Sequence, residues 1–345
     1  MRKQQGFTLI ELAVVLVVLV VMFPMIRTTI NWLFTAQSNA YIANNRLNNQ
    51  SLAAALSKYT INSTVLGRLP APYTGAGYTK TVYNPADATA PGIALEQAIT
   101  ASGVPLNAVN DDGKTAQNVR VYQLVQGLVK QVPLYFQSGA LVNLTYDYGA
   151  IYMTSCPKAT AGCNPTAATG VPGGSLAMTA GNFTTWVTAG TDDAPTYIED
   201  LTIQKQMLAT TVQRLDKVRD SLLTFLRTQQ VTAGGGDTTN WYTNQAGLSV
   251  AGLLTGANPV TNQGCRDGWY SLAATNVLPS VGLAAQEFGV TAWGGTVEYC
   301  RDYDPLAVKV ANAAPHYAAL RILANVSNGA APDNVVPGNN VVLTF

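Results

Sequence analysis

The first feature of the hydrophobic pattern is a run of apolar side chains close to the N-terminus. No residue between Leu12 and Ile26 is charged, and when the run is extended back to Phe7 only Glu11 interrupts its 20 residues. An α-helix of that length covers about 30 Å, the thickness of the hydrocarbon core of a bilayer. The pattern therefore predicts a membrane-spanning helix.

Beyond Arg27 the chain becomes more polar but keeps helical spacing. Apolar and small side chains recur at steps of three, four or seven residues, at Leu33, Ala36, Ala40, Ala43, Leu47 and Ala54. We predict one long helix over residues 7–60, and Pro24 is where it could kink because a proline removes a backbone hydrogen bond. The small side chains suit packing against other helices and, equally, against the protein's own globular part.

A second amphipathic helix is predicted over residues 199–230, and the glycines at 234–236 stop it. Its apolar stripe has a leucine at every seventh residue, at Leu201, Leu208, Leu215 and Leu222. Val218 and Phe225, which are also seven residues apart, extend the stripe. The stripe is incomplete at Gln204 and Thr211. This interruption favours packing on a sheet over a coiled coil.

Strict alternation of apolar and polar residues over 142–148 is typical of a half-buried strand. The alternation changes parity after Gly149, so we expect a β-bulge at this glycine. An apolar stretch over 119–136 precedes the strand, while residues 61–118 and 159–181 are rich in loop-forming residues. The pattern predicts an α+β protein in which an antiparallel-sheet globular region follows the long N-terminal helix.

The two halves of the chain show a similar order of features. Each has a long helix, then an aromatic-Gly pair that we interpret as part of a strand, then a cysteine, with the pairs at Tyr148-Gly149 and Trp293-Gly294 and the cysteines at Cys156 and Cys300. We hypothesise two duplicated helix-plus-sheet modules. The expected divisions are residues 1–6, 7–60, 61–198 and 199–345.

The flanks of the apolar run predict its orientation. Arg2 and Lys3 precede it, so the positive-inside rule places residues 1–6 in the cytoplasm and the chain after Arg27 outside. Residues 22–27 contain no pair of small residues at which a secretory signal peptidase would cut. We therefore expect the helix to stay attached.

The string from Lys3 to Leu12, KQQGFTLIEL, resembles the class III leader of type IV prepilins and type II secretion pseudopilins. In that family a prepilin peptidase cuts after the glycine and methylates the new amino group, which implies cleavage between Gly6 and Phe7. The resemblance also implies that Glu11 meets the new N-terminus of a neighbouring subunit during assembly. From the residues alone, Glu11 can equally stay hydrated at the membrane surface, aided by the positive end of the helix.

The resemblance implies a non-enzymatic pilin-like subunit, minor or tip-located, of a type IV pilus or a related pseudopilus. Its expected partners are the prepilin peptidase, other pilin or pseudopilin subunits and, before assembly, the inner membrane. The alternatives are a major structural pilin and a membrane-anchored binding or enzymatic domain outside the cytoplasm. After assembly the expected location is the pilus or pseudopilus.

Composition and charge narrow the classes of function. The 345 residues include 20 Lys and Arg against 19 Asp and Glu, and removal of residues 1–6 leaves 18 against 19. Such a neutral chain lacks the concentrated basic charge of a nucleic-acid-binding protein. Its one histidine, His316, and four cysteines leave little for catalytic or zinc chemistry, so we expect no cofactor and no enzyme activity.

Two segments of the chain contain acidic residues close enough in sequence to be considered as ion sites. Residues 110–115 lack the spacing of a phosphate loop or an EF-hand and are better interpreted as a turn around Gly113. Asp302, Asp304 and Glu298 could approach a Ca²⁺ ion, but nothing in the sequence supplies six oxygen ligands. We therefore predict no metal site.

Four cysteines in an exported region favour two disulfides over free thiols. Three pairings are open. Pairing Cys156 with Cys163 and Cys265 with Cys300 keeps each bridge inside one expected module, and we take it as the prediction.

Overall fold

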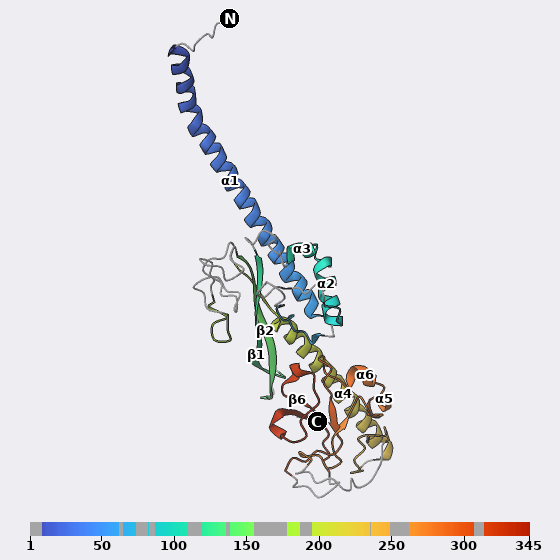
Figure 1. The fold of residues 1–345 in the computed structure, drawn as a ribbon. Coiled ribbons are helices and arrows are strands. Elements are labelled where there is room, and N and C mark those ends of the chain that lie inside the picture. The colour runs from blue at the N-terminus through green and yellow to red at the C-terminus, as the bar shows by residue number, and fades with distance from the viewer. Residues whose placement is uncertain are drawn as a thin grey trace.

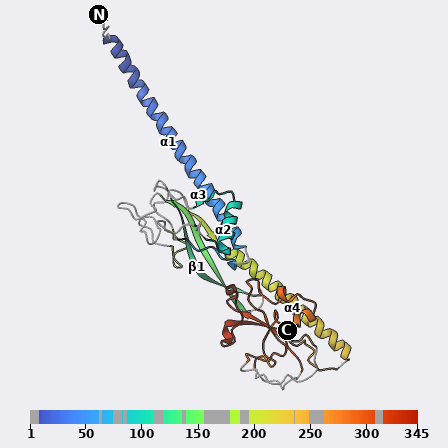
Figure 2. The same ribbon diagram turned by 45° about the vertical axis from the view of Figure 1, so that its right-hand side comes forward.

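The computed structural model shows a long rod joined to an elongated globular region (Figure 1). The rod begins at Leu9 at its free end, and the C-terminal strands lie in the part of the molecule remote from that end (Figures 1 and 2). The residues that the structure describes are 9–61, 65–73, 82, 87–109, 119–135, 139–154, 178–186, 195–234, 236–248, 262–306 and 314–345.

Helix α1, Leu9–Thr60, forms the rod and continues through Pro24. The side chains between Ala13 and Tyr41 are exposed, and the first buried one is Asn45. The helix is long and apolar enough to cross a membrane. The predicted continuous N-terminal helix is therefore present, and only its last third packs on the rest of the protein.

The first sheet is antiparallel and has the order β1-β2-β3, with β1 at Val119–Pro133, β2 at Leu141–Thr154 and β3 at Thr196–Glu199. The C-terminal part of α1 and the short helices α2, Ala90–Ala101, and α3, Leu106–Val109, pack on one face of it. Apolar side chains from all these elements form one core, which includes Leu52, Leu56, Leu95, Ile99, Val109, Tyr122, Ile151 and Ile198.

The β-bulge expected at Gly149 is wrong. The register between β1 and β2 shifts between Val125 and Leu128, so the bulge lies in β1. Gly127, inside the bulge, has a φ of +75°, which glycine adopts without a steric penalty. At Gly149 a Cβ atom would lie 3.0 Å from the ring of Tyr122. This glycine therefore allows close packing, and the pairing of β2 continues through it.

Helix α4, Leu201–Ala233, starts directly after β3 and ends at Gly234, whose φ is +105°. The second sheet is antiparallel, with the order β4-β5-β6-β7. The elements after α4 are β4 (Tyr270–Ser271), α5 (Val277–Ser280), α6 (Ala285–Phe288), β5 (Glu298–Cys300), β6 (Ala319–Leu323), η2 (Val326–Asn328), η3 (Pro337–Asn339) and β7 (Asn340–Thr344).

The buried stripe of α4 lies in a core that both sheets share. The stripe consists of Leu201, Gln204, Leu208, Thr211, Leu215, Val218, Leu222 and Leu226. Val142 and Leu144 of β2 belong to the same core as Leu320 and Ile322 of β6. A single core thus crosses the expected division between residues 61–198 and 199–345, and that division stays a prediction.

The two halves differ in the element that carries the aromatic-Gly pair. Gly149 lies in strand β2, whereas Trp293 and Gly294 lie in a turn, where Gly294 has a φ of +81°. The interpretation of Trp293-Gly294 as part of a strand is therefore wrong. Duplication of one module stays a hypothesis.

Candidate functional site

The candidate site is α1 together with the segment that attaches it to the globular region. Large apolar side chains are exposed along its N-terminal half, and they include Val14, Leu16, Val18, Leu19, Phe23, Ile26, Ile30, Trp32 and Phe34. A soluble protein rarely leaves so continuous an apolar surface uncovered. Glu11 belongs to helix α1, but the structure does not describe its side chain. Gly6 and Phe7 lie outside the described residues.

Residues 65–68, after α1, form a turn that contains two residues in the left-handed region. Leu66 has a φ of +52° and Gly67 a φ of +74°. A Cβ atom on Gly67 would lie 2.8 Å from Nε2 of Gln204 and 2.8 Å from the sulfur of Met207. The positive φ at position 67 favours glycine, and the missing Cβ atom leaves room for the ends of these two side chains.

Arg68, which follows this turn, is held by the buried carboxylate of Asp147 in β2. Its Nε donates to Oδ2 over 3.0 Å and its Nη2 to Oδ1 over 2.6 Å. The backbone N–H of Gly127, in the bulge of β1, donates to the same Oδ1 over 2.9 Å. The Asp147 side chain is only 1% exposed and that of Arg68 25%. The bulge, β2 and the end of α1 are thereby joined at one carboxylate.

A second buried carboxylate lies beside the first. Oδ1 of Asp200, at the start of α4, accepts from the backbone N–H of Asp147 over 2.8 Å, and Oδ2 accepts from that of Leu69 over 3.0 Å. Burial raises the pKa of Asp200 to about 7, and the charge of Asp147 adds to the increase. The two backbone donors and Arg68 oppose it. Asp147 is thus held by the Arg68 guanidinium and Asp200 by two backbone N–H groups.

The polar interruptions of the α4 stripe are hydrogen-bonding positions. Nε2 of Gln204 donates to the carbonyl of Leu66 over 3.1 Å, and Nε1 of Trp293 donates to Oε1 of Gln204 over 2.8 Å. The hydroxyl of Thr211 accepts from the backbone N–H of Ala292 over 3.0 Å. The turn after α1 is therefore connected through α4 to the loop that contains Trp293.

The remote end of the molecule contains a disulfide between Cys265 and Cys300, with a Cα–Cα distance of 5.8 Å. This is the pair expected from the sequence. Cys156 and Cys163 lie outside the described residues, so their pairing stays a prediction.

The one histidine of the sequence, His316, contacts the backbone: its Nε2 lies 2.6 Å from the carbonyl oxygen of Thr238.

The acids considered for calcium all have arginine partners. Arg266 lies 2.7 Å from a carboxylate oxygen of Asp304 and 3.8 Å from one of Asp302. Glu298 pairs with Arg321 over 2.6 Å. Within the described residues no three His, Cys, Asp or Glu side chains are grouped to hold a metal ion. These carboxylates therefore connect loops and strands through ion pairs.

Comparison with family models places the prokaryotic N-terminal methylation motif at residues 1–23. No curated protein matches the chain, and neither does any solved structure. The motif is the class III leader of type IV prepilins and pseudopilins. It supports a type IV pilin- or pseudopilin-like subunit and implies processing by prepilin peptidase and assembly with other pilin subunits.

Proteins with this motif are generally structural and non-enzymatic. The leader and the apolar helix fit anchoring in a membrane followed by assembly into a pilus. Sequence reasoning reached the leader because its residues are contiguous. It missed Arg68, Asp147, Asp200 and Gln204, which come together only in the fold, although the two polar interruptions of an apolar stripe were a usable signal.

Proposed function

We propose that this protein is a non-enzymatic subunit of a type IV pilus or related pseudopilus and occupies a minor or tip position. One observation carries the proposal: the chain joins the leader motif at residues 1–23 to a helix that is bare from Ala13 to Tyr41. A surface of this kind is suited first to lipid and then to the helices of other subunits.

The size of the chain supports a minor or tip position. About 285 residues lie beyond α1, and those that the structure describes form an elongated body with two sheets (Figure 2). A domain of this bulk on every subunit would crowd a shaft in which the helices pack closely. A subunit used sparingly, or only at the end of the filament, avoids that conflict.

In the proposed sequence of events the N-terminus starts in the cytoplasm and α1 crosses the inner membrane. Prepilin peptidase then cuts between Gly6 and Phe7 and methylates Phe7. The carboxylate of Glu11 next pairs with the amino terminus of a neighbouring subunit, which compensates a charge that otherwise costs up to about 3 kcal/mol in the membrane.

Intact-mass analysis of the chain extracted from membranes tests the processing step. We expect a mature chain that begins at methylated Phe7, and we expect Gly6→Val to remain uncut because the peptidase of this family needs a small residue before the cut. Wild-type protein that retains residues 1–6 would contradict the proposal.

Quantitative mass spectrometry of sheared, purified filaments tests the position. We expect the chain to be present at a small fraction of the abundance of the main subunit. Equal abundance would indicate a major pilin. Complete absence from filaments, with the processed chain left in the membrane, would favour an anchored binding or enzymatic domain.

A further inference from the structure

The outer edge of β7 differs from the other sheet edges that the structure describes. The edge strand β1 carries the bulge, Lys130 and a terminal proline, β3 ends in the charged residue Glu199, and β4 has only two residues. Such features discourage pairing with another chain. In contrast, no charged side chain occurs from Val335 to Phe345, and β7 lies at the end of its sheet.

The hydrogen-bond register shows which backbone groups of β7 face outward. Ala318 and Phe345 exchange both of their backbone hydrogen bonds, over 2.9 and 3.0 Å. In an antiparallel pair such residues alternate with residues whose N–H and C=O groups point away from the partner. Val342 and Thr344 therefore direct these groups away from β6, toward the edge where the described residues place no further strand.

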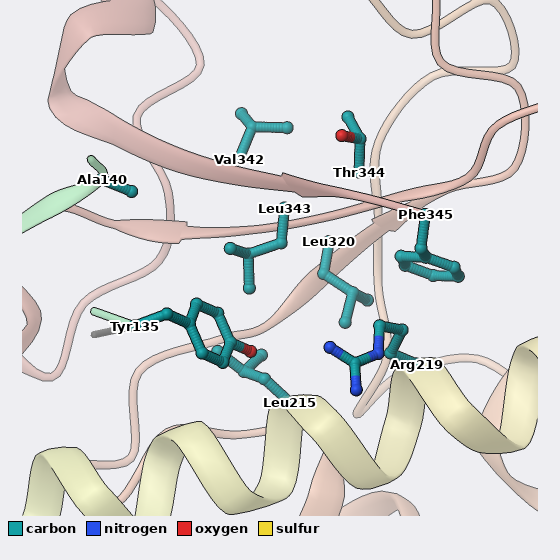
Figure 3. Close-up of a pocket in the computed structure, with 9 residues that line it drawn as sticks. All are labelled: Tyr135, Ala140, Leu215, Arg219, Leu320, Val342, Leu343, Thr344 and Phe345. Carbon is teal, nitrogen blue, oxygen red and sulfur yellow. The ribbon is translucent and has the colours of Figure 1, made fainter. Parts of the chain in front are cut away.

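A pocket of about 300 Å³ adjoins this edge (Figure 3). Residues 342–345 line one side of it, and Tyr135 and Ala140, at the turn between β1 and β2, line another. Leu215 of α4 and Leu320 of β6 also line it, and Figure 3 shows them between the helix and the strands. The volume is at the lower limit of ligand pockets and suits one or two apolar side chains.

The charges around the pocket indicate which occupant fits. Among the described residues that line it, Arg219 is the one cation, and it already pairs with Asp216 over 3.0 Å and with Asp220 over 2.9 Å. Burial and the charge of Asp216 raise the pKa of Tyr135, so its hydroxyl stays neutral. Asp216 and Asp220 thus compensate the charge of Arg219, and the apolar walls of the pocket favour an uncharged segment over a charged one.

We propose that β7 accepts an extended, uncharged segment of a neighbouring pilin-like subunit as an added strand, with one of its apolar side chains in this pocket. The partner segment pairs with the outward backbone groups of Val342 and Thr344, and the pocket selects its side chain. This mode of recognition combines main-chain affinity with side-chain specificity. The identity of the partner rests on the proposed function, whereas the strand addition does not.

Residue-resolved hydrogen exchange of the full chain in detergent tests the strand addition. The probe is a synthetic peptide with the uncharged sequence Asn-Val-Val-Leu-Thr-Phe, and the control peptide carries Asp at its second and fifth positions. We expect the uncharged peptide to slow exchange of the Val342 and Thr344 amides about tenfold or more and the acidic peptide to have no effect. Unchanged exchange with both peptides would overturn the proposal.

The variant Thr344→Pro removes one outward N–H without touching a hydrogen bond to β6, because proline is tolerated at the open side of an edge strand. It should abolish protection of Val342, and Thr344→Val should preserve it. Thr344→Lys, which places a charge on the edge, is the second variant if the proline alters the unfolding transition. If Val342 stays protected in both Thr344→Pro and Thr344→Lys, strand addition at β7 is contradicted.

The same amides, measured in filaments, test the partner. Protection of Val342 and Thr344 there, relative to detergent, supports a neighbouring subunit as the occupant. A filament-borne chain whose two amides exchange as fast as in detergent overturns that assignment alone. Absence of the chain from filaments instead contradicts the proposed function, and the peptide measurement still decides whether β7 accepts a strand.

Discussion

The Asp147 carboxylate connects strand β2 to Arg68, in the segment after α1, and to Gly127, in the bulge of β1. Removing the cation that pairs with Asp147 leaves its buried charge without compensation. The free-energy cost of such a buried charge is larger than the net stabilisation that an intact buried ion pair provides. We expect Arg68→Leu to lower the free energy of unfolding by about 3 kcal/mol or more. Chemical denaturation of the full chain in detergent, followed by tryptophan fluorescence, is the measurement.

Two controls separate this effect from a general loss of surface charge. Arg219→Leu removes exposed ion pairs and should cost less than about 1 kcal/mol. Adding Asp147→Asn to Arg68→Leu should recover part of the loss. Equal effects of Arg68→Leu and Arg219→Leu would show that Asp147 is not the buried junction described above.

Asp200 gives the protein a pH dependence of a defined sign. Its pKa is about 7 in the folded chain and near 4 in an unfolded chain. Between these values the native state holds the additional proton, so the free energy of unfolding falls as pH rises, by at most about 1.4 kcal/mol per unit. The stabilisation is fully present below pH 4 and is lost above pH 7.

Denaturation curves of wild type and Asp200→Asn across pH 4 to 8 check this prediction. The asparagine variant has no proton to exchange at this position, so its stability should fall less steeply over the same interval. Parallel curves for the two proteins would mean that Asp200 is ionised in the folded state throughout.

Local sequence predicted some of these residues and not others. Gly6, Phe7 and Glu11 stand in a contiguous motif, so the sequence alone could indicate processing. Asp147 alternates with Tyr146 and Tyr148 in a strand, which suggests a solvent-facing carboxylate. Its burial depends on Arg68, 79 positions away, and no local pattern reports such a contact.

At the level of elements, the disulfide joins the end of β5 to the loop that precedes β4. Its cysteines are 35 positions apart. Closing a loop of that length restricts the unfolded chain enough to contribute about 4 kcal/mol in the chain-entropy description. We expect the double variant Cys265→Ala, Cys300→Ala to lose stability of that order, measured by denaturation without reductant.

Non-reducing peptide mapping of the same protein identifies the remaining pairing. A Cys156–Cys163 peptide would support the second predicted bridge, and Cys156→Ala, Cys163→Ala is the matched variant, with a smaller expected loss because its loop is short. A peptide that joins either of these cysteines to Cys265 or Cys300 would contradict the pairing.

Long, periodic elements were predictable and short ones were not. The apolar periods of α1, α4 and β2 extend over many residues, so the pattern outweighed local noise. Strands β4 to β7 have two to five residues, and their pairing joins distant segments. Gln204 and Thr211 interrupt the apolar stripe in the sequence, and in the fold these two side chains bond α4 to the loops packed on it.

At the scale of the whole molecule, substitution of Glu11 should affect membrane insertion and filament assembly differently. Glu11→Ala removes a carboxylate that is costly in the membrane, so insertion should be unchanged or improved by up to about 3 kcal/mol. If the carboxylate pairs with the amino terminus of a neighbour, incorporation into filaments should fall sharply. Membrane fractionation and filament counts by mass spectrometry measure the two effects separately.

Glu11→Asp is the matched control, since it keeps the charge with a shorter side chain and should retain part of the incorporation. Normal incorporation of Glu11→Ala would indicate that the carboxylate stays hydrated at the membrane surface. Failure of both variants to insert would instead show that the acid is needed before assembly begins.

The length of α1 makes the subunit a lever. Its 52 residues form a rod about 78 Å long, and helices in bilayers tilt by about 20° on average. A tilt of that size carries the far end of the rod sideways by about 27 Å. A tilt of about 20° within the lipid therefore moves the end of α1, and the globular region packed on it, sideways by almost the thickness of the bilayer core.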